Sequence, residues 1–385
     1  MSQRVLITGA RAPVALHWCR LFAEAGWDVH AADCLTHPLA RFSRKVGAFH
    51  RFPSPVFEAA SFASAFNGLV EDLDPDLILP TCEEVFHLAL SAARRPWQSK
   101  LFAPSFETLM ALHDKAAFNA LVAERVPTFA PAFKRVESRA DLDGLKGVDW
   151  VLKPCFSRFA TDVLVQPSQS KIAAINPNIS EPWLAQEYLP GREVCLSAVV
   201  AKGRLVAAQA YHPIVRLRGG VGAGVTFEAA SNATNARLGD FVEPLVAGET
   251  FSGQLSFDFR EDGNGQWKVI ECNPRSTSGF HFFGPRVGLV EAVTDGRKTA
   301  LTASEGRVMG ERLPTLLLGG LKGLRLLGSI ETLSAWPGDS LGPLAQLRAF
   351  RELWALKQKH KCSLEAASTV DICWNQPATE SLPQT

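Results

Sequence analysis

The chain has 385 residues, of which 46% are apolar and 21% are charged. A chain of this length and composition predicts an ordinary globular protein with two or three domains rather than a single core. The formal net charge of +1 gives no electrostatic reason to expect a nucleic acid or a membrane as partner.

The cysteines and the first residues bear on the cellular compartment. The eight cysteines form no C-x-x-C pair, and most lie in apolar runs, which predicts buried thiols that stay reduced. The chain enters a predicted strand at residues 4–7 with no apolar leader before it, so we expect no signal peptide. Both observations favour a cytoplasmic protein.

Residues 1–105 alternate predicted strands and helices. The apolar patterns place strands at 5–7, 28–32 and 76–80, and helices at 13–25 and 84–93. This alternation predicts a parallel sheet with helices on its faces, which is an α/β lobe. Gly9 ends the first strand without the later glycines of a dinucleotide-binding loop, whereas Asp33 would suit a ribose hydroxyl, so NAD(P) binding stays an alternative.

Three further units follow along the chain. A helix around 113–123 opens an α+β unit over 106–190, and a second α+β unit covers 191–300. Residues 301–385 are leucine-rich and predicted to be helical, without the uninterrupted apolar run that a membrane span needs. An amphipathic helix predicted at 345–361 would pack on the body or on a second subunit, so a homodimer stays open.

The most informative pattern is a predicted hairpin whose turn, 261–265, contains the Asn-Gly pair typical of tight turns. Asp258 and Glu271 then lie on adjacent antiparallel strands. Asn273 shares a face with Glu271 because side chains alternate along a strand. Two carboxylates and an amide oxygen suit Mg²⁺, and Arg275 adds a fork of donors for phosphate oxygens.

Two lysines upstream are candidates for binding phosphate. Lys115 lies in a predicted helix, and Lys153 ends an apolar strand just before a proline. A charged residue in an apolar run needs a partner, and an ATP phosphate is one candidate. The next loop carries Ser157 and Arg158, whose donors could close over phosphates. A solvated helix lysine and an ordinary strand connection are the alternatives.

A strand-to-strand crossing follows at residues 183–194. One apolar strand ends at Gln186 and Glu187, the chain turns at a Pro-Gly pair, and a new strand begins at Glu193. Backbone groups from Glu187 to Leu189 could pair with the edge of adenine. The Glu193 carboxylate could accept hydrogen bonds from ribose hydroxyls, although each residue taken alone is equally compatible with an ordinary surface position.

The order of these features resembles the ATP-grasp superfamily: a helix lysine, a Lys-Pro strand end, E-x-x-x-G-x-E, then D-x₁₂-E-x-N-x-R. Its members include biotin carboxylase, D-alanine–D-alanine ligase and L-amino-acid ligases, and the E-x-N-P-R segment is typical of the carbamoyl-phosphate-synthetase-like group. The resemblance covers roughly residues 1–300. It implies an α/β and α+β protein with an ATP-grasp fold: an N-terminal Rossmann-like pre-ATP-grasp lobe, two α+β subdomains that enclose ATP, and a C-terminal helical segment.

The resemblance also implies a role for each matching residue. Around the phosphates and the Mg²⁺ (or Mn²⁺) it places Lys115, Lys153, Asp258, Glu271, Asn273 and Arg275. Around the adenine and ribose it places Gln186, Glu187, Tyr188, Leu189 and Glu193. Cations are needed because phosphoryl transfer depends on charge stabilisation at the phosphate oxygens. The loop with Ser157 departs from the glycine-rich pattern of many relatives, so its closure stays open.

Candidate substrate residues lie outside this set. Glu83 and Glu84 follow a predicted strand, where open α/β sheets bind ligands, and could hold a substrate amine; Glu84 could instead stabilise a helix N-terminus. Arg218 stands in a loop with four glycines that could face an acceptor carboxylate, with His212 before it. Ser278, just beyond the metal strand, could contact an acylphosphate.

These features predict an ATP-dependent carboxylate–amine ligase. Such an enzyme forms an acylphosphate from a small carboxylic or amino acid and joins it to an amine, releasing ADP and phosphate. The alternatives are a bicarbonate-activating carboxylase or carbamoyl-phosphate-type enzyme, an NAD(P)-dependent oxidoreductase that uses the N-terminal lobe, and a non-catalytic ATP-binding module. We expect small-molecule partners, and neither nucleic acid nor membrane.

Overall fold

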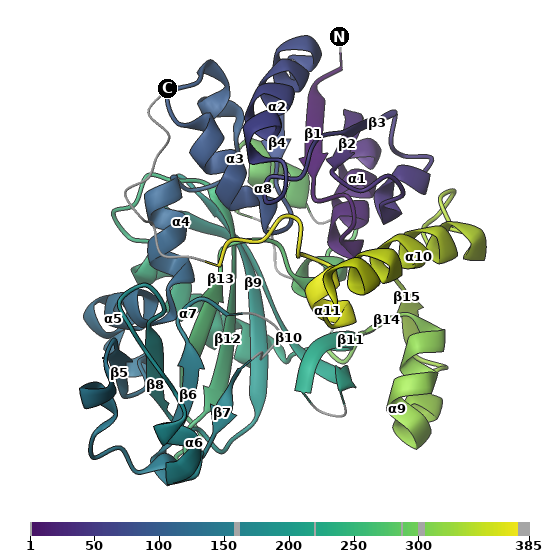
Figure 1. Ribbon diagram of the computed structural model, residues 1–385. Coiled ribbons are helices and arrows are strands. Elements are labelled where there is room, and N and C mark those ends of the chain that lie inside the picture. Colours follow the sequence, from purple (N-terminus) through teal and green to yellow (C-terminus); the bar gives the residue numbers. More distant parts are fainter. Residues whose placement is uncertain (1, 158–161, 219–220, 286–287, 299–304, 376–385) are drawn as a thin grey trace.

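The computed structural model describes residues 2–157, 162–218, 221–285, 288–298 and 305–375. Three sheets organise this part of the chain: two of four strands and one of seven (Figure 1). In chain order they form an N-terminal domain, a small subdomain and a large subdomain. All eight cysteines are free and six of them are buried, as their apolar surroundings predict.

The N-terminal domain is a parallel sheet of strand order β3-β2-β1-β4 with helices on both faces. Its elements are β1 (Arg4–Thr8), α1 (Pro13–Glu24), β2 (Asp28–Asp33), β3 (Ala48–Arg51), α2 (Ala59–Leu73), β4 (Leu77–Leu79) and α3 (Glu84–Ala92). Alternate residues of β1 serve the two faces: Val5 packs under α1, and Leu6 packs with α2 and α3. The α/β lobe predicted from the sequence is present.

Two helices, α4 (Phe106–His113) and α5 (Lys115–Arg125), lead into the small subdomain. The sequence predicts one helix around 113–123, but a new helix begins at Lys115 because the Asp114 carboxylate caps it. This carboxylate accepts hydrogen bonds from the N–H groups of Ala116 and Ala117 at 2.9 and 3.2 Å. Lys115 is therefore fixed at the first turn of α5.

The small subdomain is a four-stranded antiparallel sheet of order β5-β8-β6-β7. Its elements are β5 (Phe133–Val136), β6 (Trp150–Pro154), β7 (Leu164–Val165), α6 (Gln169–Ala173) and β8 (Trp183–Glu187). Leu152 of β6 and Ala185 of β8 pack with Ile172 of α6 in its own small core. Lys153 follows Leu152, so its side chain leaves the opposite face of the sheet.

The large subdomain is built on the seven-stranded sheet of order β13-β12-β9-β10-β11-β14-β15. Its elements up to residue 298 are β9 (Glu193–Ala201), β10 (Arg204–Arg218), β11 (Val221–Ala229), α7 (Asn232–Leu245), β12 (Gly253–Glu261), β13 (Trp267–Asn273) and α8 (Leu289–Thr294). Helices α5 and α7 cover one face, where Phe118 and Phe241 pack against Phe257. The two predicted α+β units are thus present.

The large sheet continues beyond residue 300, where the sequence predicts only helices. Strand β14 (Val308–Gly310) pairs with β11, and β15 (Ile330–Thr332) pairs with β14. The predicted helices of 301–385 are present, but these two strands extend the large sheet past the expected boundary at 300. Strands of three residues are too short to leave a period-two pattern in the sequence.

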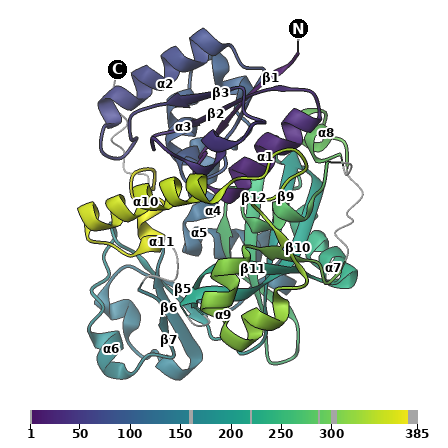
Figure 2. The ribbon, with the colours of Figure 1, turned by 90° about the vertical axis from the view of Figure 1, so that its right-hand side faces the viewer.

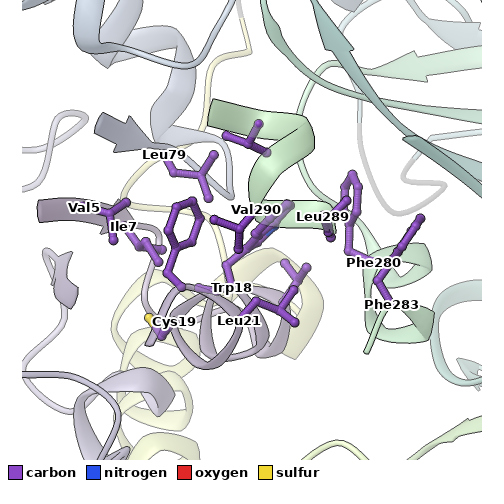
Figure 3. Close-up of a cluster of buried hydrophobic side chains, with 14 of the residues drawn as sticks. Val5, Ile7, Trp18, Cys19, Leu21, Leu79, Phe280, Phe283, Leu289 and Val290 are labelled. Atoms are coloured by element: carbon purple, nitrogen blue, oxygen red, sulfur yellow. The ribbon is translucent and has the colours of Figure 1, made fainter. Parts of the chain in front are cut away.

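One apolar core joins the N-terminal domain to the large subdomain. Trp18 of α1 packs against Phe280, and both belong to a buried cluster that includes Leu289 and Val290 of α8 (Figure 3). The same cluster contains Val5 of β1. Because this core is continuous across the boundary, the N-terminal domain is held in a fixed place above the large sheet.

The C-terminal segment forms α9 (Arg312–Leu326), α10 (Pro343–His360) and α11 (Leu364–Ala367). No described helix combines the length and the apolarity that crossing a bilayer requires. Residues 363–374, which we call the strap, then run back between the N-terminal domain and the large subdomain (Figure 1). The Ile372 side chain of the strap is buried in the α2–α3 core.

A buried ion-pair network fastens the strap. The Arg11 guanidinium bonds to Asp33 at 2.6 Å and also to Asp371 of the strap, and all three side chains are nearly inaccessible to solvent. The strap carbonyls of Asp371 and Cys373 accept hydrogen bonds from Ser54 and from the His87 ring. The strap is thus an integral part of the N-terminal domain.

We predict that Arg11→Ala lowers the free energy of unfolding by about 3–5 kcal/mol, because two buried carboxylates lose the cation they share. Denaturant unfolding followed by tryptophan fluorescence measures the change. Arg297→Ala, which removes a solvent-exposed ion pair with Asp295, is the control and should leave stability unchanged. Equal stability of the Arg11 variant and the wild type would contradict the network.

Candidate functional site

The predicted hairpin is formed by β12 and β13, and it brings the expected metal ligands together. In the antiparallel register Asp258 stands opposite Glu271, and Ser256 stands opposite Asn273. The Asn273 amide lies 3.5 Å from the Asp258 carboxylate. One face of the hairpin therefore presents two carboxylates and an amide, as the alternation along the strands predicts.

The two carboxylates perturb each other strongly. Burial raises the pKa of Asp258, and the neighbouring Glu271 charge raises it further. Burial also opposes the charge of Glu271, but Lys115 and Lys153 outweigh it and hold the pKa of Glu271 below its usual range. Two adjoining, half-buried carboxylates resist ionising together unless a cation lies between them. The donor set consequently fits a hard divalent ion such as Mg²⁺.

Such an ion would need ligands beyond this hairpin. Among the described residues, no three His, Cys, Asp or Glu side chains gather at one point. Asp258, Glu271 and Asn273 supply three oxygen atoms, whereas Mg²⁺ takes six and commonly shares them with waters and phosphates. These three side chains thus fit an open metal site that water or a ligand would complete, and they do not form a closed metal cage.

A bulge in β13 frees a backbone carbonyl near the carboxylates, which the sequence does not predict. The register passes from Asp258–Glu271 to Phe259–Val269, so Ile270 has no partner across the ladder. Its carbonyl instead accepts hydrogen bonds from Lys153 Nζ at 3.0 Å and from Gln186 Nε2 at 3.3 Å. The bulge therefore anchors the end of β6 beside the carboxylates.

Lys153 and Lys115 lie on the two sides of this cluster. Lys153 is almost fully buried, and burial lowers its pKa to about 8 despite the nearby carboxylate of Glu271. Lys115 Nζ lies 3.7 Å from Glu271 Oε2 and donates a 2.7 Å hydrogen bond to the Ser157 carbonyl. Both predicted lysines thus converge on the predicted metal strand, from a helix and from a different sheet.

Arg275 connects the cluster to the N-terminal domain. Its Nε donates to Glu83 Oε1 at 3.0 Å, and its Nη2 lies 3.5 Å from Asn273 Oδ1. Glu83 is 2% exposed. The position of Glu83 after a strand predicts that it could bind a substrate amine, but its carboxylate instead orients Arg275.

Glu84 lies deeper than a substrate-binding residue should. It is fully buried, and its Oε1 accepts hydrogen bonds from Thr8 Oγ1 at 2.7 Å and from the Thr81 N–H at 3.1 Å. It ties the ends of β1 and β4 together at the start of α3. The expectation that Glu84 binds a substrate amine is therefore corrected: its carboxylate joins two strand ends, a structural role that differs from the predicted stabilisation of a helix N-terminus.

The predicted adenine hinge is partly occupied by the protein itself. The N–H of Glu187 donates to Ala132 O at 2.8 Å, and that of Tyr188 donates to Asp149 O at 2.9 Å. Neither group is free for an adenine nitrogen. Gln186 supports Asn119 and the Ile270 carbonyl rather than facing a ligand. The backbone role of Leu189 and of the Glu187 and Tyr188 carbonyls stays a prediction.

The remaining expected residues are placed as follows. Glu193 pairs with Arg216 and lies 3.6 Å from Arg260, and its carbonyl oxygen lies 2.8 Å from His212 Nδ1. The side chain of Arg218 and all of Arg158 lie outside the described residues. Ser278 begins a short 3₁₀ helix directly after Thr277.

A group of hydroxyls beside the metal strand escaped the sequence analysis. Thr277 Oγ1 lies within hydrogen-bond distance of Ser197, Ser256 and Tyr211, at 2.6, 2.9 and 3.1 Å. These residues come from four separate segments, and small hydroxyl residues carry no spacing signal. Only the tertiary fold reveals the group.

The described part of the chain also contains a cavity of about 310 Å³ away from this cluster. It lies between α3, the start of α4 and the residues before β12, and Ser105, Thr108 and Phe251 are among its lining residues. None of the expected site residues lines it. The candidate functional residues therefore lie in the charged cluster and not in this cavity.

Comparison with solved structures gives the fold. The chain resembles an L-amino acid ligase from Bacillus licheniformis at 14% identity (78% of this chain, 75% of that one, TM-score 0.55). It also resembles N5-carboxyaminoimidazole synthetase from Staphylococcus aureus complexed with ADP at 16% identity (79% and 80%, TM-score 0.58). A third is the biotin carboxylase domain of the Hydrogenobacter thermophilus 2-oxoglutarate carboxylase, in complex with MgADP, ADP and bicarbonate, at 13% (72% and 65%, TM-score 0.55).

The chain has the ATP-grasp fold. The fold predicted from the ordered motifs is therefore confirmed. No protein-family model matches the chain, and no curated protein matches its sequence. The identities of 13–16% show the ATP-grasp architecture and leave the activity to be argued from the site itself.

We predict that the affinity for ADP falls as the pH is raised from about 7.5 to about 9. Lys153 loses its proton as the pH passes its lowered pKa of about 8, and the phosphates then lose a cation. The phosphates of ADP are already ionised in this range. Fluorescence titration at each pH measures the change. Lys153→Arg stays charged throughout and should give a flat profile; an equal slope in both proteins would contradict this role.

Proposed function

We propose that the protein is an ATP-dependent ligase that activates a small carboxylate and joins it to an amine. The observation that carries the proposal is the convergence of two buried lysines, Lys115 and Lys153, on the half-buried carboxylates of Asp258 and Glu271. Removing four charged groups of three separate structural units from water costs free energy, and a charged ligand would offset that cost. A nucleotide triphosphate with its Mg²⁺ has the required mixture of charges.

The residues present fit such a ligand. Asp258, Glu271 and Asn273 would hold Mg²⁺, and the two lysines would neutralise phosphate oxygens that the metal does not reach. Mg²⁺ would supply charge stabilisation to the phosphoryl group in transit. Arg275, oriented by Glu83, would place a planar fork of donors beside the same group.

The proposed reaction has two steps. A carboxylate oxygen of the substrate attacks the γ-phosphorus of ATP, and ADP leaves, which gives an acylphosphate. The amine attacks the acyl carbon, phosphate leaves, and the amine loses a proton as the carbon–nitrogen bond forms. The chain contributes positioning, charge stabilisation and exclusion of water, because the cluster lies between the two subdomains.

The structure bears unequally on the alternatives. An NAD(P)-dependent enzyme would use Asp33 for a ribose hydroxyl, but this carboxylate accepts hydrogen bonds from Arg11 and from the Leu35 N–H. The strap also fastens to Arg11 at the end of β1, where a dinucleotide would lie. Bicarbonate activation shares the nucleotide half of the site and differs from the ligase only in the acceptor.

The function is tested by incubating the protein with ATP and Mg²⁺ against a panel of amino acids and small carboxylic acids, in pairs, while ADP and phosphate are measured. We expect phosphate release that depends on one acid and one amine. Release that depends on bicarbonate alone would favour the carboxylase alternative. Nucleotide binding with no turnover on any pair would favour a regulatory ATP-binding module.

We predict that Glu271→Gln lowers turnover by about 10³-fold or more while the thermal unfolding midpoint stays within a few degrees. The amide keeps the shape but removes a negative ligand from Mg²⁺. Phosphate-release kinetics measure the loss. Glu243→Gln changes the same group on the exposed surface of α7 and should keep wild-type rates. Undiminished activity of the Glu271 variant would refute the metal assignment.

A further inference from the structure

Exposed apolar side chains are concentrated on two C-terminal helices. Of the fifteen large apolar side chains that are exposed among the described residues, ten belong to α9 and α10. Helix α9 is kinked at Gly320, and its exposed side chains include Leu313 and Leu317 before the kink and Leu321 after it, which are 66%, 72% and 79% exposed. Soluble proteins rarely expose apolar patches of this extent without a binding function.

Helix α10 also exposes apolar side chains to solvent. It has 18 residues, and none of them is buried. One side rests on the body, where Glu352 accepts hydrogen bonds from the N–H groups of Thr36 and His37. The outward side carries Leu347 and Trp354. A helix that buries no residue gains little from packing, so its outer face is suited to a surface outside this chain.

The two helices lie on one side of the molecule. This side is on the right in Figure 1, and the view in Figure 2, turned by 90°, looks directly onto α9 and α10. We call the outward surface of these helices the C-terminal face. It belongs to neither the nucleotide cluster nor the core that joins the domains.

The C-terminal face is strongly cationic, although the whole chain is nearly neutral. Residues 312–361 contain eight lysines and arginines and three acidic residues, against +1 for the whole chain. All three acids are engaged internally: Glu331 pairs with Arg307, Asp339 pairs with Arg20, and Glu352 binds backbone N–H groups. None of the eight cations forms an ion pair with a described residue of the chain.

The positive charge of the C-terminal face helps to decide which kind of partner could cover it. A second copy of the chain, docked face to face, would bring two sets of unpaired cations together. A protein partner is disfavoured by composition, because half of the cations are lysines and most of the apolar residues are leucines, both under-represented in protein interfaces and their hot spots. Leucine, tryptophan and phenylalanine combined with lysine and arginine are instead typical of helices that lie in a membrane interface.

We propose that the C-terminal face docks the protein peripherally on an anionic lipid bilayer. The leucines of α9 and the Leu347–Trp354 stripe of α10 insert at the level of the acyl boundary, and the cations contact the lipid headgroups. The near-zero net charge of the chain conceals this surface because the compensating acids lie elsewhere in the molecule.

The test is flotation of the full chain with vesicles of phosphatidylcholine alone and with about 30% phosphatidylglycerol. We expect binding only to the anionic vesicles, and its loss at about 1 M salt, where charges are screened within about 3 Å. Arg348→Gln with Arg351→Gln should weaken binding by about 30-fold, which is the loss of two surface cations. Leu317→Glu with Leu321→Glu should abolish it.

Ile179→Glu is the matched control. Ile179 is 77% exposed but belongs to the small subdomain, so this variant should bind vesicles as the wild type does. Light scattering and thermal unfolding of each variant exclude aggregation and misfolding as causes. Absence of binding to anionic vesicles overturns the proposal. A dimer in solution that Leu317→Glu dissociates, with no vesicle binding, would assign the face to a second copy instead.

Discussion

The structure depends on the balance of buried opposite charges around Glu271. The carboxylates of β12 and β13 lie side by side, and lysines from α5 and β6 lie next to them. The positive charges of the lysines lower the free-energy cost of removing the carboxylate charge from water. The bulge at Ile270 makes this possible, because its unpaired carbonyl holds Lys153 at the site. Charges in such an arrangement are prepared for a metal and phosphates, which would complete the neutralisation.

The surrounding architecture keeps this cluster in place. The apolar core around Trp18 and Phe280 fuses the N-terminal domain to the large sheet, and Arg11 fastens the strap to the N-terminal domain through Asp371. Across that junction Glu83 orients Arg275, so the α/β lobe contributes a positioning residue to the cluster. The small subdomain has a core of its own and meets the cluster through the end of β6.

Local patterns predicted what depends on neighbouring residues. The alternation of β12 and β13 placed Asp258 and Glu271 opposite each other. The ATP-grasp fold was implied by the resemblance of the ordered motifs to that superfamily. Long-range partners were beyond the sequence: Glu83 pairs with a residue 192 positions away, and Glu84 supports β1 from inside the core. The sequence also could not show that the Glu187 and Tyr188 N–H groups donate hydrogen bonds to the carbonyls of Ala132 and Asp149, because these contacts depend on the tertiary fold. Strands β14 and β15 were missed because three residues carry no periodicity.

The central claim is that the lysine–carboxylate cluster binds the phosphates of a nucleotide together with a divalent metal. Calorimetric titration of ADP, with Mg²⁺ and then with EDTA, tests this claim most directly. The account predicts one ADP per chain in Mg²⁺, and a loss of affinity of about tenfold or more when the metal is removed. It also predicts that Glu271→Gln binds ADP equally under both conditions. A wild-type protein that binds no ADP, or binds it identically with and without the metal, would contradict the account.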